Sequence, residues 1–122
     1  MATVNLMNAT SMVEKLLCST QLSTTSITTV YTVPASSGLK LASGILCNTS
    51  VSSVTLSVYI VPSGGTAGAT NKIIHSYSLA AADSLSLGDI INGLMLGEGD
   101  FIAVECSASN ALNVVLSGAV AS

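Results

Sequence analysis

The sequence predicts an all-β protein: a single antiparallel β-sandwich, of immunoglobulin-like or jelly-roll type, over residues 14–122, behind a short N-terminal arm at residues 1–13. Apolar residues recur at every second position in several short segments, and turn-forming residues separate these segments. The segments are also rich in β-branched residues, which disfavours helices. A length of 122 residues suits one domain with a real core.

The first residues, "MATVNLMNATSM", match neither the strand period nor the turn chemistry of the rest. Exposed to water, Val4, Leu6 and Met7 would be unused apolar surface, so we predict an arm that docks on a neighbouring subunit. A frayed terminus is the alternative. The capping-box pattern at Ser11–Glu14 leaves a single helical turn open as well.

Two predicted strands follow, at residues 14–22 and 26–34, and the turn at 23–25 predicts that they form a hairpin. The next strand, at 38–50, is expected to turn Leu39, Leu41, Ile45 and Cys47 to the core. Gly44 would be a bulge or a close-packing point in this strand.

The clearest alternation lies in "SVTLSVYIVP", where Val54, Leu56, Val58 and Ile60 share one face. The opposite face would carry Thr55, Ser57 and Tyr59. We expect this strand to pair with the preceding one and to end at Pro62, because proline donates no ladder hydrogen bond.

The loop after Pro62 consists almost entirely of small residues. We predict that it exposes backbone to a neighbouring subunit, and the alternative is a merely permissive connection. The candidate assembly contacts in this loop are Ser63, Gly64, Gly65, Thr66 and Gly68.

The remaining chain predicts a strand at 72–79, a turn and short strand at 81–88, and a connection of undetermined type at 89–96. A tight turn at 97–100 leads into a further strand. The final strand would direct Val114, Leu116 and Val120 to one face. Eight or nine short strands are expected in total.

Charge excludes several functions. Only 7% of residues are charged, the net charge is −3, and the chain contains three lysines and no arginine. No basic patch is therefore available for nucleic acid or for an anionic membrane. The chain instead contains 20 Ser and 12 Thr, interleaved with aliphatic residues. Small neutral side chains are easily desolvated, which favours assembly with copies of itself or with a larger structure.

The sequence contains no catalytic or cofactor signature. There is no G-x-S-x-G elbow or phosphate-binding loop, and His75 is the single histidine. Cys18, Cys47 and Cys106 are too far apart for a zinc site, and we expect Cys47 and Cys106 to be buried free thiols. Acidic residues at turns favour turn formation, with a calcium site as the weaker alternative. These acidic residues are Asp83, Asp89, Glu98 and Asp100.

Five short segments give the chain a resemblance to a known family: "YTVP" from 31, "CNTS" from 47, "VPSGGTAG" from 61, "GEGD" from 97 and "VVLSG" from 114. With them, most of the chain after the arm resembles the small β-sandwich structural proteins in virions of tailed bacteriophages. The resemblance implies a virion component made in the host bacterial cytoplasm. It would be a capsid decoration protein or belong to the tail and its fibres. It further implies a homo-oligomer, for which we expect a trimer, in contact with the major capsid protein or tail proteins.

A carbohydrate-binding sandwich is the alternative of a different class. Sugar sites commonly stack a sugar on an aromatic ring, and this chain has no Trp, three Tyr and one Phe. Such a site would depend on Tyr59 and Tyr77 sharing the polar face of neighbouring strands.

Overall fold

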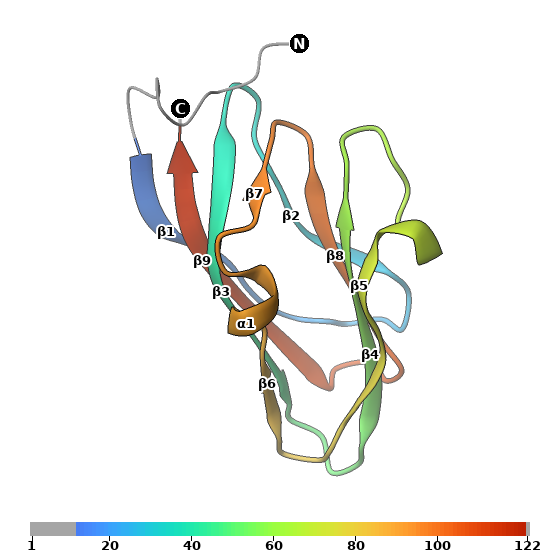
Figure 1. Ribbon diagram of the computed structural model, residues 1–122. Helices are drawn as coiled ribbons and strands as arrows, with labels where there is room; N and C mark the ends of the chain where they lie inside the picture. Colours follow the sequence, from blue (N-terminus) through green and yellow to red (C-terminus); the bar gives the residue numbers. More distant parts are fainter. Residues whose placement is uncertain (1–11, 122) are drawn as a thin grey trace.

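The structure is a computed structural model that describes residues 12–121. Within this range, nine strands form two antiparallel sheets that pack face to face (Figure 1). Two short helical segments, η2 (Ala69–Asn71) and α1 (Gly88–Ile91), lie in connections between strands. The predicted all-β sandwich is confirmed. None of the described helices is long and apolar enough to cross a membrane.

The two sheets differ in size. The five-stranded sheet has the order β1-β9-β3-β6, and β7 also pairs with β3. Its strands are β1 (Met12–Gln21), β3 (Gly38–Asn48), β6 (Ser84–Ser86), β7 (Met95–Leu96) and β9 (Leu112–Ala121). The four-stranded sheet has the order β2-β8-β4-β5. Its strands are β2 (Thr28–Thr32), β4 (Val54–Val61), β5 (Lys72–Leu79) and β8 (Phe101–Cys106).

The strand pairs are nested along the chain. β4 pairs with β5, β3 with β6, β2 with β8 and β1 with β9. The chain is therefore one long hairpin wrapped around the core, with β7 as an addition, and this is a jelly roll rather than an immunoglobulin-like sandwich. Two predicted pairings are wrong. β1 does not form a hairpin with β2, and β3 does not pair with β4, because in both cases the connection crosses from one sheet to the other.

The described part of the chain opens with β1, which starts at Met12. Residues 12 and 13, which we assigned to the arm, therefore belong to the sheet. Val4, Leu6 and Met7 lie outside the described residues.

The core lies between the sheets, and a bulge in β3 changes which residues reach it. Leu39 and Leu41 are fully buried, as predicted. The register with β9 shifts between Leu41 and Ser43, so Leu46 points inward while Ile45 and Cys47 point outward. The prediction that Ile45 and Cys47 face the core is wrong for this reason.

Gly44 is a close-packing point, one of the two roles that we considered. A Cβ atom there would lie within about 3 Å of the side chains of Leu116, Ile91 and Leu87. The missing side chain leaves room for α1 and its flanking residues. This segment covers the stretch of β3 between β6 and β7, where Leu87 N–H donates to Gly44 O at 2.7 Å.

The other predicted inward faces are confirmed. Val54, Leu56 and Val58 are buried in the core, and Ile60 packs against it. Val114 and Leu116 are buried as well, and Val120 packs against the same cluster.

Candidate assembly surfaces

The loop from Pro62 to Asn71 lies at one end of the sandwich, beside the loops that follow β2 and β7 (Figure 1). Ser63, Gly64, Gly65 and Thr66 are exposed there, and Gly68 is half-buried. Gly64 has a φ of 79°, a conformation that favours glycine. The predicted sequence of a strand, a shaped loop and a second strand is confirmed, whereas contact with a neighbour stays a prediction.

Side chains hold this loop in a defined shape. Asn71 Nδ2 donates to Thr66 O at 2.9 Å, and Gly68 N–H donates to Asn71 Oδ1 at 3.0 Å. At the start of the loop, Ser63 N–H donates to Asp100 Oδ1 at 2.8 Å. The exposed glycines are therefore carried on a scaffold of hydrogen bonds.

The turn at 97–100 fastens the neighbouring loops together. Asp100 Oδ2 accepts a hydrogen bond from Gly97 N–H at 2.8 Å, and Glu98 Oε1 accepts one from Ser36 N–H at 3.0 Å. Gly99, with a φ of 83°, leaves space for Ser63, because a Cβ there would collide with the Ser63 side chain. The "GEGD" motif thus shapes this end of the molecule, and its acidic groups stabilise turns as predicted.

The same loop covers a small apolar cluster on the outer side of the four-stranded sheet. Tyr59, Val61 and Ala103 are buried in it, with Ala67 of the loop packed against them. The Tyr59 hydroxyl donates to Glu105 Oε1 at 2.9 Å, and Lys72 Nζ lies 5.4 Å from the centre of the Tyr59 ring. Burial, together with the hydrogen bond and the negative charge of Glu105, raises the pKa of Tyr59.

This arrangement corrects the predicted polar face. Tyr59 is only 2% exposed, so its ring offers no surface to a sugar. Tyr77 pairs with the inward-facing Leu56, so it does not share a side of the sheet with Tyr59. Tyr77 is 44% exposed because β5 is an edge strand.

The solvent side of the five-stranded sheet is a second surface, which the sequence analysis did not identify. We call it the five-strand face. It consists of the outward side chains of three strands and of β7: Glu14, Leu16, Ser19, Lys40, Ala42, Ser43, Ile45, Met95, Val115, Ser117 and Ala119. Leu16, Ile45 and Met95 are 60%, 46% and 61% exposed. Apart from Glu14 and Lys40, these side chains are uncharged.

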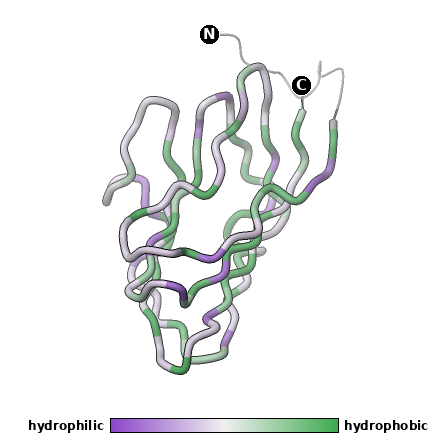
Figure 2. Tube along the Cα trace, turned by 180° about the vertical axis from the view of Figure 1, so that it is seen from behind, coloured by the Kyte–Doolittle hydropathy of each residue, from purple (hydrophilic) through white to green (hydrophobic). Residues whose placement is uncertain are grey.

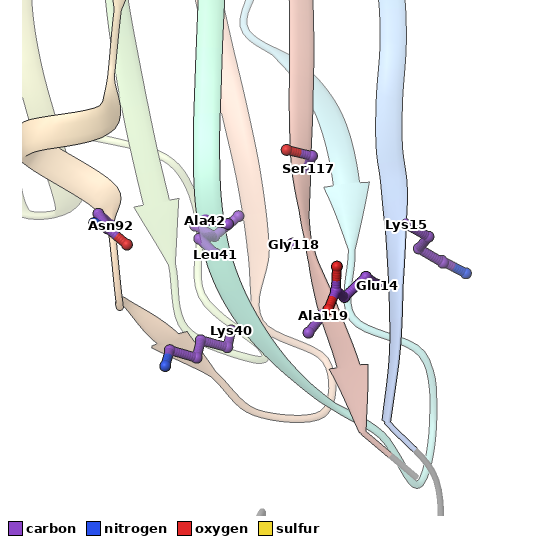
Figure 3. Close-up of a pocket in the computed structure, with 9 residues that line it drawn as sticks. All are labelled: Glu14, Lys15, Lys40, Leu41, Ala42, Asn92, Ser117, Gly118 and Ala119. Carbon is purple, nitrogen blue, oxygen red and sulfur yellow. The ribbon is translucent and has the colours of Figure 1, made fainter.

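A shallow hollow of about 780 Å³ lies on this face (Figure 3). Small residues, Ala42, Ser117 and Ala119, line the hollow from β3 and β9. Three charged residues also line it: Glu14 and Lys15 from β1, and Lys40 from β3 on the other side of β9. In Figure 3 the Glu14 side chain lies beside Ala119, whereas Lys40 extends away from β9. The hollow exists because short side chains lie between longer ones on this face.

The strand register arranges the face in rows. Glu14 and Lys40 both pair with Ala119, from opposite sides of β9. In the next row, Leu16 and Ser43 both pair with Ser117, and the Ser43 and Ser117 hydroxyl oxygens lie 2.9 Å apart. Ser19 and Ile45 pair with Val115 in the third row.

Charged residues are sparse along the described part of the chain. In Figure 2, strongly hydrophilic positions are few and scattered along the trace. Within residues 12–121, no group of three or more His, Cys, Asp or Glu side chains could hold a metal ion. The three cysteines are free, and only Cys106 is fully buried. Burial raises the pKa of the Cys18 thiol.

Comparison with known protein families, curated proteins and solved structures finds no match to this chain. Assignment to bacteriophage virions therefore stays a prediction, and the surfaces described above are the physical basis for a function.

Proposed function

We propose that this chain is a non-enzymatic structural protein of a bacteriophage virion: a capsid decoration protein that coats the head. Its partners would be copies of itself and the major capsid protein, and it would join the particle after synthesis in the host cytoplasm. The observation that carries the proposal is the five-strand face. A broad sheet surface with exposed aliphatic side chains and few charges suits burial against protein.

Two further features support an assembly role. The loop at Ser63–Thr66 offers uncharged backbone on a rigid scaffold, so contact with a neighbour would order little additional chain. The jelly roll is also used by viral capsid domains. Lectin domains use it as well, so the fold alone does not separate the two functions.

The test is the copy number of this chain, relative to the major capsid protein, in purified particles analysed by quantitative mass spectrometry. We expect nearly equal numbers of the two proteins. A few copies per particle would instead place the chain on the tail or its fibres. Complete absence from particles would refute the virion proposal, and binding to a glycan array would then favour carbohydrate recognition.

A further inference from the structure

Three edge strands, β1, β2 and β5, are protected against pairing with another strand. The edge strand β1 has a bulge between Leu16 and Cys18, and the exposed Lys15 of this strand extends away from β9 (Figure 3). The edge strands β2 and β5 are also irregular, and Ser76 in β5 has a φ of 47°. Bulges and lysines on an edge strand are known devices against edge-to-edge pairing. Self-association through added strands is therefore disfavoured.

The five-strand face has no such protection, and its rows are complementary to themselves. β9 lies in the middle, with β1 on one side and β3 on the other. In the row of Ala119, β1 contributes the negative Glu14 and β3 the positive Lys40. The Cα atoms of these two residues are two strand spacings apart, about 10 Å. The face thus has opposite charges at matched positions on either side of its middle strand.

We infer that two copies of this chain pair through their five-strand faces, about a two-fold axis that runs along β9, in place of the trimer that we expected from the resemblance. Such an axis keeps β9 in the middle and places β1 of each copy over β3 of the other. Glu14 then faces the partner's Lys40, and Lys40 faces the partner's Glu14. The row of Ala119 therefore supplies both ion pairs of the interface.

The same two-fold rotation also brings together uncharged side chains of complementary size. Leu16 faces the partner's Ser43, and Ile45 faces the partner's Ser19, so each large aliphatic side chain meets a small one. The central Val115 meets its own copy on the axis. The two pairs on either side of the axis thus combine a protruding side chain with a short one, which suits sheets packed about 10 Å apart. This pairing rests on the self-association in the proposed function, but not on the virion.

Charge reversal tests the pairing. We expect sedimentation of the full chain to give a mass twice the 12.2 kDa of one protomer. Glu14→Lys and Lys40→Glu each create like-charge contacts, so each should raise the dimer dissociation constant at least about tenfold. The double variant restores opposite charges and should return the constant to within about threefold of the original.

Lys15→Glu is the matched control. It makes the same charge change as Lys40→Glu, one residue from Glu14. Lys15 also lines the hollow, but its side chain extends away from β9 (Figure 3). We expect it to leave the dimer unchanged, and circular dichroism will show that every variant folds. A single-chain mass at millimolar concentration, a trimer, or a dimer insensitive to charge reversal would overturn the pairing. The sedimentation measurements test the pairing alone, and the copy number in particles tests the virion proposal alone. Either proposal can therefore be refuted while the other stands.

Discussion

Two glycines with nearly the same backbone conformation differ in their surroundings. Gly93 and Gly99 have φ values of 84° and 83°, but a Cβ at Gly93 would meet nothing within 4 Å, whereas at Gly99 it would collide with Ser63. We expect Gly93→Ala to lower the free energy of unfolding by about 1 kcal/mol, from backbone strain alone. Gly99→Ala should lower it by about 3 kcal/mol, because overpacking adds to the strain. Urea denaturation measures both, and equal losses would contradict the close contact between the loops.

Tyr59 predicts a dependence of stability on alkaline pH. Its pKa is raised in the folded state above the usual value of 10.0, so folding favours the neutral phenol. Below pH 10 the phenol is neutral in both states and this contribution is fully present. As the pH rises from 10 through the folded-state pKa, the unfolded state loses its proton first, and the free energy of unfolding falls.

Tyr59→Phe separates this effect from those of other groups, since burial also raises the pKa of Tyr31 and Cys18. The variant should lose about 1 kcal/mol at neutral pH through the missing hydrogen bond to Glu105. Denaturation curves recorded across the alkaline range should then fall less steeply than those of the original protein. An unchanged slope would show that Tyr59 does not contribute.

At the scale of elements, Asn48 joins three segments at the end of β3. Its side chain is completely buried, and Nδ2 donates to Ser52 O, Leu79 O and Ala80 O at 2.8, 3.2 and 3.1 Å. Asn48→Ala would leave these carbonyls without that donor, and we expect it to lower the free energy of unfolding by about 3 kcal/mol.

Asn113 is the control, because it lies beside Cys47 in the adjacent strand and its Oδ1 has no hydrogen-bond partner. Asn113→Ala should change the free energy of unfolding by less than about 1 kcal/mol in the same urea titration. Similar losses in the two variants would mean that the Asn48 network does not hold these segments together.

The sequence predicts the positions of the strands well, because alternation and turn residues are local signals. Which residues of a strand point into the core could be predicted only as far as the first bulge in that strand. β4 and β9 follow the expected inward faces, whereas in β3 the residues that face inward change at Ala42, two residues before the Gly44 that we considered as a bulge. Ile45 was assigned to the core for this reason. It is instead a major apolar residue of the five-strand face.

Strand partners, at the scale of the whole molecule, could not be predicted from local patterns. Nested pairing joins residues almost a full chain length apart, as in Met12 with Ala121, and short connections suggest hairpins that the sandwich does not form. The five-strand face depends on this pairing, because its rows combine the first, third and last strands. The loop at Ser63–Thr66 was predictable since all its residues are contiguous.

The N-terminal arm gives a prediction at the same scale. A chain that starts at Met12 retains all nine described strands, so we expect its free energy of unfolding to change by less than about 0.5 kcal/mol. If Val4, Leu6 and Met7 dock on a neighbour, this chain should nevertheless fail to join particles. Mixing it with particles that lack the protein and measuring co-sedimentation tests this. Binding equal to that of the full chain would refute the arm as a contact.

The position of β9 also sets the order of events during synthesis. The hairpin of β4 and β5 is the first strand pair of which both members have been synthesised, so it can form first. The pairs that enclose it can form afterwards. β9 is translated after the other eight described strands, but it lies between β1 and β3 in the sheet. Those two strands must wait for residues 112–121 before the larger sheet can close. A chain that stops short of this segment lacks the strand between β1 and β3, so we expect it not to reach the folded state.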